Sequence, residues 1–205
     1  MAENNFNLLI DELPSTVEVD GSSFFINTDY RYGLLFNQLI DDGDIDDKQK
    51  ILQALEIGFT DEIPKNIEEG FRKLIYFYSC LDLDNKDLED VNNEIEESVD
   101  DNEQSEALFD YTKDTILIYS TFMQVYHIDL VEVNMHWYKF MALLRALFDE
   151  NNLTKVLQFR AMKIDGKMTP DMKKYYTKMK QHYSLNRYSK KEKDELKNKM
   201  MEEWG

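Results

Sequence analysis

Hydrophobic positions near the N-terminus alternate with polar ones before the spacing becomes helical. Residues 16–19 alternate, Asp20-Gly21 suits a type I′ turn, and residues 22–26 form a return strand. In this register Val17 lies opposite Phe24, which gives the ribbon one apolar face. The pattern predicts a short β-hairpin.

Three amphipathic helices are predicted between the hairpin and residue 81. Asn27 or Thr28 can cap the first helix, and Pro64 suits the first turn of the third. Apolar residues recur every three or four positions along each helix, so we expect these stripes to form core. The stripes are Tyr32, Leu35, Phe36, Leu39 and Ile40; then Ile51, Leu52, Leu55 and Phe59; then Ile67, Phe71, Leu74, Tyr78 and Leu81.

An acidic segment follows at residues 82–106, with 12 Asp or Glu and one Lys. It has no sustained apolar stripe, so it is predicted to be a solvated loop or linker. A calcium-loop pattern at its start lacks the required glycine and terminal glutamate, and we interpret it as a loop. We therefore divide the chain into residues 1–81, residues 82–106, a C-terminal helical part at residues 107–163, and a basic helical tail at residues 164–205.

Helices are also predicted throughout the second half of the chain. Residues 112–127 are apolar around much of the helix, which favours a central position. Residues 136–148 form the next helix, and a short one follows near residue 153. Thr169-Pro170 is a cap and first-turn pair for a helix with the stripe Met168, Met172, Tyr175, Met179 and Tyr183. A capping box at Ser189 predicts a last, sparsely apolar helix.

These elements predict a mainly α fold: a multi-helix domain with a short N-terminal β-hairpin and a basic C-terminal helical extension. The chain has 205 residues, enough for a core without metal or disulfide support. Seven Gly and three Pro are few for a sandwich or barrel. Cys80 is the single cysteine, so an internal disulfide is excluded and a buried, reduced thiol is expected.

Charge narrows the classes of partner. The formal net charge is −17, divided into −23 for residues 1–159 and +6 for residues 160–205. This charge balance argues against general binding of nucleic acid and against binding to an anionic membrane surface. The first residues do not resemble a signal peptide, and no apolar run reaches the ~20 residues of a membrane span.

The sequence lacks recognisable catalytic motifs. The sequence has no Gly-rich phosphate loop, nucleophile elbow or zinc-protease motif. The three histidines are His127, His136 and His182, and a two-histidine metal site is the less favoured reading of the first two. We expect no enzyme, no metal and no cofactor.

Aromatic and methionine residues are the clearest physical clue, with 12 Phe, 12 Tyr and 10 Met. In the basic tail they are interleaved with lysines. This pattern fits an RNA-stacking patch, an adaptable surface for a partner helix, or a stripe that docks on the protein's own acidic body. The charge asymmetry favours binding to protein over binding to RNA. The periodic spacing favours docking on the protein's own acidic body.

Residues 114–147 carry a family resemblance. The stretch reads Asp114-x-x-x-Ile118-Tyr119-Ser120-x-Phe122-x-x-x-Tyr126-x-Ile128-Asp129-Leu130, then His136-Trp137-Tyr138-x-Phe140-x-x-Leu143-Leu144-x-x-Leu147. It resembles the "gene product fifteen" family of phages and prophages of Gram-positive bacteria. Residues 13–31 and the segment Phe159-Arg160-Ala161-Met162 are similar to other parts of that family, so the resemblance spans nearly the whole chain.

The resemblance implies a place in tail morphogenesis. Genes of the family lie between those for the tail tube and the tape measure, the position of tail assembly chaperones in long-tailed phages. The implied partners are the tape measure protein and the tail tube protein. The implied location is the cytoplasm of the infected bacterium, with the protein absent from the mature virion. Self-association and production as part of a frameshift fusion stay open.

Two surfaces are candidates for binding tape-measure helices. One includes Tyr126, Phe140 and Leu144; the other is the stripe Met172, Tyr175, Met179 and Tyr183. Trp137 is expected to be core. Two alternative functions remain: an acidic inhibitor that mimics nucleic acid and acts on a host protein, and a structural tail component.

Overall fold

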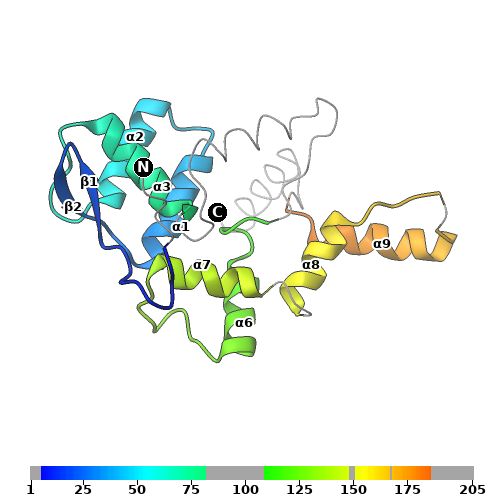
Figure 1. Cartoon of the computed structure of the whole chain (residues 1–205). Helices are drawn as coiled ribbons and strands as arrows, with labels where there is room; N and C mark the ends of the chain where they lie inside the picture. Colours follow the sequence, from blue (N-terminus) through cyan, green and yellow to red (C-terminus); the bar gives the residue numbers. More distant parts are fainter. Residues whose placement is uncertain (1–5, 82–108, 148–150, 167, 186–205) are drawn as a thin grey trace, which may run out of the picture. The chain divides into compact units, whose positions relative to one another are not determined.

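The computed structural model describes residues 6–81, 109–147, 151–166 and 168–185. In these residues it contains seven helices and a two-stranded antiparallel sheet (Figure 1). The predicted fold class is confirmed. The chain divides into two compact units: unit 1 comprises Met1–Gln104 and Phe122–Ala146, and unit 2 comprises Ser105–Thr121 and Leu147–Gly205. The segment 82–106 and the helix predicted at Ser189 lie outside the described residues.

The hairpin consists of β1 (Thr16–Val19) and β2 (Ser22–Phe25). Val17 pairs with Phe24, as the alternation predicts. Asp20 and Gly21 have φ values of 50° and 75°, and a type I′ turn requires positive φ at both central residues. Glycine and aspartate tolerate this conformation better than most residues, so the turn sequence fixes the register locally.

Helices α1 (Tyr30–Asp41), α2 (Asp47–Gly58) and α3 (Ile67–Tyr78) follow the hairpin. The N-cap of α1 is Asp29, so the predicted cap at Asn27 or Thr28 is wrong. The backbone of those two residues is used elsewhere: Asn27 N–H donates to the Gly58 carbonyl, and the Thr28 carbonyl accepts from Trp137 N–H. The third helix likewise begins after Pro64, with Asn66 as its cap.

The buried face of α1 differs in phase from the predicted stripe. It consists of Tyr30, Gly33, Phe36 and Leu39, whereas Tyr32 and Leu35 are exposed. The hydroxyl of Tyr30 donates to the Leu130 carbonyl, which anchors the start of the helix and turns its inward face toward that residue. Two residues of the predicted α1 stripe, Phe36 and Leu39, are buried as expected. Beyond α1, the predicted core is confirmed at Leu55, Phe59, Leu74, Tyr78, Leu81 and Cys80, but Leu52 and Ile67 are exposed.

Residues 122–146 belong to the same unit as the hairpin and α1–α3, although they follow the acidic segment. They contain α7 (Trp137–Ala146) and the end of α6 (Thr115–Tyr126). Tyr30 N–H donates to the Met135 carbonyl at 2.9 Å, and Arg31 donates to the carbonyls of Leu130, Val131 and Val133. The division of the sequence at the acidic segment did not anticipate this long-range association.

Trp137 is fully buried at the centre of unit 1, as expected. Its indole N–H donates to the Tyr78 carbonyl at 3.0 Å. An added Cβ at Gly33 would lie 2.3 Å from the indole ring, so α1 and α7 can approach only because this position is glycine.

In α6, Ile118 and Phe122 are buried but Ile116 and Met123 are exposed, so the broadly apolar helix is only partly enclosed.

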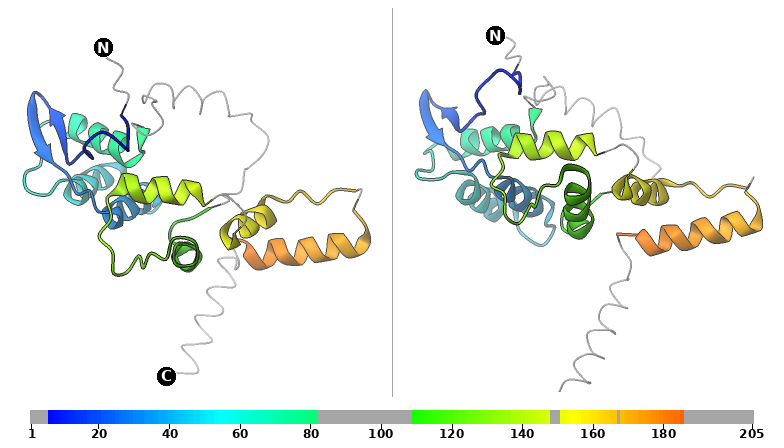
Figure 2. Two further views of the ribbon diagram at one scale, coloured as in Figure 1. Left: turned by 60° about the horizontal axis from the view of Figure 1, so that its bottom comes forward. Right: turned by 90° about the horizontal axis from the view of Figure 1, so that it is seen from below.

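Unit 2 contains α8 (Asn152–Ala161) and α9 (Pro170–Tyr183), which lie side by side (Figure 2). Thr169 is the N-cap of α9 and Pro170 occupies its first turn, as predicted. Asn151 and Thr154 form a capping box at the start of α8. These local signals fix both helix starts.

Candidate protein-binding surface

The first group of candidate partner-binding residues lies in the core of unit 1. Phe140 is fully buried, with ring centroids 4.8 Å from Tyr30 and 5.3 Å from Phe122. Leu144 is also buried, and the half-buried Tyr126 donates its hydroxyl proton to the Leu143 carbonyl. Phe140 and Leu144 are therefore not accessible to a partner in this structure, and a role for them in partner binding stays a prediction. Their apolar spacing reflects packing against α1 and α6.

The second group lies on α9 and is accessible. No side chain of α9 is buried; Met172 is 45% exposed and Tyr175 is 52% exposed. Met179 and Tyr183 are half-buried. Met172, Tyr175 and Met179 follow the i, i+3, i+7 spacing of residues on one helical face. We call the face formed by Met172, Tyr175, Met179 and Tyr183 the α9 face.

Phe159 of α8 connects the two helices of unit 2. Its ring stacks on Tyr183 at a centroid distance of 5.6 Å with an 8° interplanar angle. It also meets the edge of Tyr175 at 6.4 Å. The stripe of α9 is thus divided, with Tyr183 attached to α8 while Met172 and Tyr175 extend into solvent.

Arg160 fixes the C-terminal end of α9. Its Nε donates to the carbonyl of Tyr183, the last residue of the helix. Its two terminal nitrogens donate to the carboxylate of Asp114, both at 2.7 Å, and the side chains are only 10% and 4% exposed. A buried, bidentate pair of this kind has little geometric freedom. Both residues occur in the segments of family resemblance, but nothing in the sequence paired them.

Lysines surround the apolar part of α9. Lys174 and Lys178 are exposed, and Lys173 and Lys180 are half-buried.

The described residues between 152 and 185 carry seven Lys or Arg against two Asp, a net charge of +5. The described residues between 6 and 81 carry six Lys or Arg against 15 Asp or Glu, a net charge of −9. The asymmetry seen in the sequence is therefore retained between described parts of the two units.

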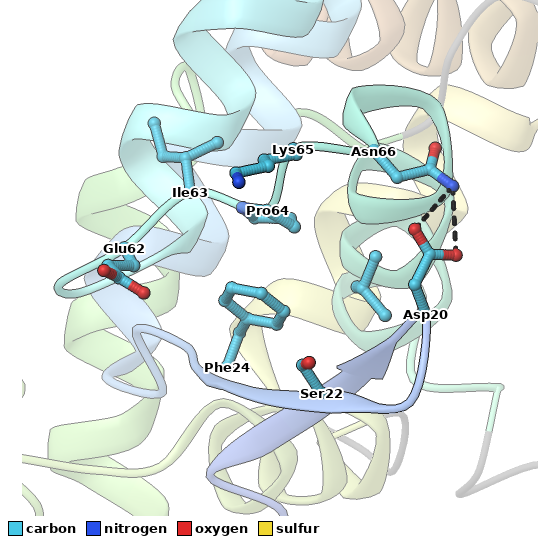
Figure 3. Close-up of a pocket in the computed structure, with 9 residues that line it drawn as sticks. Asp20, Ser22, Phe24, Glu62, Ile63, Pro64, Lys65 and Asn66 are labelled. Carbon is cyan, nitrogen blue, oxygen red and sulfur yellow. Dashed lines mark hydrogen bonds between the residues drawn. The ribbon is translucent and has the colours of Figure 1, made fainter.

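A hollow in unit 1 was not predicted from the sequence (Figure 3). It measures about 380 Å³ and lies between the hairpin turn and the segment that joins α2 to α3. Val19, Phe24, Ile63 and Pro64 form its apolar part. Its remaining lining residues are polar or charged: Asp20, Ser22, Glu62, Lys65 and Asn66. Sequence reasoning missed it because its two sides are about 40 residues apart in the chain.

Asn66 holds one wall of this hollow in place. Its amide nitrogen donates to both carboxylate oxygens of Asp20, at 3.2 and 3.1 Å, and its amide oxygen accepts from Glu69 N–H. One side chain thus caps α3 and fixes the hairpin turn. The hollow is preformed on this side, which lowers the cost of ordering it when a partner binds.

The histidines do not form a metal site with other ligands in the described part of the chain, where no group of three potential ligands occurs. In His136, Nδ1 accepts from Tyr138 N–H, so Nε2 carries the proton and donates to the Pro14 carbonyl at 2.9 Å. Burial lowers the pKa of His136, the hydrogen bond to Pro14 opposes this in part, and Lys139 lowers the pKa further. His136 is therefore a structural residue that is held neutral.

The fold and these surfaces define a class: a small, mainly helical protein with a buried aromatic core in one unit and an open, basic, apolar helical face in the other. No described helix has the length and apolar character needed to cross a membrane.

The chain belongs to the Bacteriophage Gp15 protein family, whose model matches residues 9–185. The match covers most of the chain and confirms the resemblance, so this is a bacteriophage protein. Searches of curated proteins and of solved structures found no significant match.

Proposed function

We propose that this protein assists the assembly of a long phage tail by binding the tape measure protein, tail tube subunits or both. Its family membership supports the proposal, because the resemblance implies a place in tail morphogenesis. The proposed role is binding, in the cytoplasm of the infected bacterium, and it needs neither a catalytic residue nor a cofactor.

The α9 face is the observation that carries this proposal. Two of its apolar side chains, Met172 and Tyr175, are about half exposed although they share one helical face. Such spacing suits an amphipathic partner helix, and methionine adapts to varied apolar sequences. The high net charge of the chain would keep an exposed apolar face soluble.

Co-expression with the tape measure protein of the same phage tests the proposal. We expect the wild-type protein to move the tape measure into the soluble fraction, and the M172S/Y175S variant to do so much less. Leu52→Ser is the matched control, because Leu52 is a similarly exposed apolar residue on α2 (53%). If the tape measure is no more soluble with the wild-type protein than without it, binding of the tape measure is excluded.

An inventory of purified virions separates this role from that of a structural tail component. An assembly factor that leaves before completion should be nearly absent from particles by mass spectrometry. A stoichiometric amount relative to the tail tube subunit would instead identify a component of the tail.

A further inference from the structure

The hollow of unit 1 and the α9 face are complementary in charge and in apolar character. Two of the nine lining residues of the hollow are acids, Asp20 and Glu62, and one is a base, Lys65. The α9 face carries two exposed apolar side chains, Met172 and Tyr175, and the exposed Lys178 lies one turn after Tyr175. The hollow offers an apolar recess with more acids than bases, and the α9 face offers projecting apolar side chains beside a base.

The apolar part of the hollow is accessible. Ile63 is 46% exposed, and Phe24 is half-buried with its ring against Phe59 at a centroid distance of 6.1 Å. Val19 and Pro64 are buried beneath them. About 380 Å³ is at the lower end of the volumes that hold a small ligand, and it is enough for one or two large side chains.

The α9 face supplies side chains of that size. Tyr175 and Met172 lie one turn apart on the helix, where an apolar body can enter a hollow while flanking charges stay at its rim. Burying them would remove from water the largest exposed apolar residues of α9. A tyrosine or methionine anchor surrounded by charges resembles the centre and rim of a protein interface.

We propose that the α9 face of one copy docks in the hairpin hollow of a second copy, with Tyr175 and Met172 against Phe24 and Ile63. The contact is heterologous, because two different surfaces meet, so its repetition links copies head to tail. Lys178 faces the acidic rim, and Lys65 opposes it. The proposal goes beyond tail assembly and does not depend on it, although tape-measure helices and a second copy would compete for the α9 face.

Sedimentation velocity of the purified full-length protein alone tests the contact. Over about a hundredfold range of concentration in the micromolar region expected for a small contact, the mean mass should rise from 24.4 kDa toward dimers and larger species. Raising the salt concentration should shift the rise to higher protein concentrations, because rim charges are screened. A mass of one chain under all these conditions overturns the proposal.

Charge reversal and mixing give a result that unfolding cannot imitate. The hollow variant Glu62→Lys and the helix variant Lys178→Glu should each self-associate roughly tenfold more weakly or worse than wild type. Mixed in equal amounts, they should associate again, because the altered hollow then meets the altered helix and the two unaltered surfaces meet each other. Failure of the mixture to recover, with both variants folded by circular dichroism, rules out this pairing of surfaces.

Lys65→Glu provides a gain of function. It removes the base that opposes α9 and should tighten self-association several-fold. Asp44→Lys and Lys155→Glu are matched controls, since they make the same charge changes at exposed positions outside the hollow and the α9 face. If Lys65→Glu weakens association, or if the controls match the surface variants, the contact is not the one proposed.

Discussion

The core of unit 1 and the helix pair of unit 2 use aromatic residues in opposite ways. In unit 1, Phe140 stacks with Tyr30 of α1 and Phe122 of α6, Trp137 stacks with Phe140, and both residues are fully buried. In unit 2, α9 has aromatic residues at similar spacing but no buried side chain. The difference lies in the neighbours: residues of α7 have ring contacts with α1, α3 and α6, whereas among the described elements α9 has its main contacts with α8.

This contrast shows that an apolar stripe does not by itself identify a core. A stripe becomes core when other elements cover it from several sides, and it remains a surface when only one helix lies against it. The remaining exposed part is then available to another molecule. The predictions below test this difference, from the largest expected effect to the smallest.

Trp137→Ala should cause the largest loss of stability. Removing a fully buried indole leaves a cavity and also removes the donor to the Tyr78 carbonyl, so we expect a loss of about 4 kcal/mol in the free energy of unfolding. Urea titration followed by circular dichroism measures it. Trp137→Phe is the conservative control and should cost clearly less; equal stability of Trp137→Ala and wild type would show that unit 1 lacks the described core.

Arg160→Met should destabilise unit 2 by about 3 kcal/mol, because the Asp114 carboxylate would remain buried without its partner. Hydrogen exchange should show faster exchange of amides in α9 and unchanged exchange in α7. The double variant D114L/R160M should recover part of the loss, since it removes both buried charges. If the double variant is less stable than the single one, the ion pair contributes more than compensation of buried charge.

Gly33→Ala should cost roughly 2 kcal/mol, because the new Cβ would lie 2.3 Å from the Trp137 ring and force α1 and α7 apart. Thermal unfolding measures the effect. Gly43→Ala is a suitable control, as nothing lies within 4 Å of an added Cβ there. Similar losses at both positions would indicate that the close contact at Gly33 is not responsible.

Tyr175→Ala should change stability by no more than about 0.5 kcal/mol, the usual range for surface substitutions. Binding to a partner should nevertheless weaken, and this combination distinguishes a surface residue from a core residue. A loss of 2 kcal/mol or more in urea titration would place Tyr175 with Trp137, as part of a core.

His136 should give a small dependence of stability on pH. Burial lowers the pKa of His136 in the folded state, so below about pH 6.5 the unfolded chain binds more protons and the free energy of unfolding falls with falling pH. We expect His136→Gln to be less sensitive between pH 7.5 and pH 5.5 than wild type. An identical pH dependence in both proteins would assign the effect to other groups.

Local signals in the sequence were sufficient for most elements of the fold. The Asp20-Gly21 turn set the hairpin register, and Thr169-Pro170 set the start of α9, because both act through neighbouring backbone groups. The predicted cap of α1 was wrong for the opposite reason. Asn27 and Thr28 are used by distant backbone partners at Gly58 and Trp137, which no local pattern contains.

The candidate surface was predicted only in part. The α9 residues were identified from their spacing, and Met172 and Tyr175 are exposed. Phe140 and Leu144 had equally good spacing but are buried, because periodicity defines a helix face without saying what covers it. The hollow at the hairpin and the Asp114–Arg160 pair bring together residues that lie about 40 or more positions apart, so neither was predicted.

By itself the sequence determined the helices, the hairpin, the charge asymmetry and the family, since each depends on residue type and short-range spacing. Tertiary structure decided which apolar stripes became core. It brought residues 122–146 into unit 1 through hydrogen bonds with residues 28–31, and this enclosed Trp137 and Phe140. Among the described elements it gave α9 its main contacts with α8 and left Met172 and Tyr175 in contact with solvent. Burial depends on what surrounds a side chain, and that is a property of distant parts of the chain.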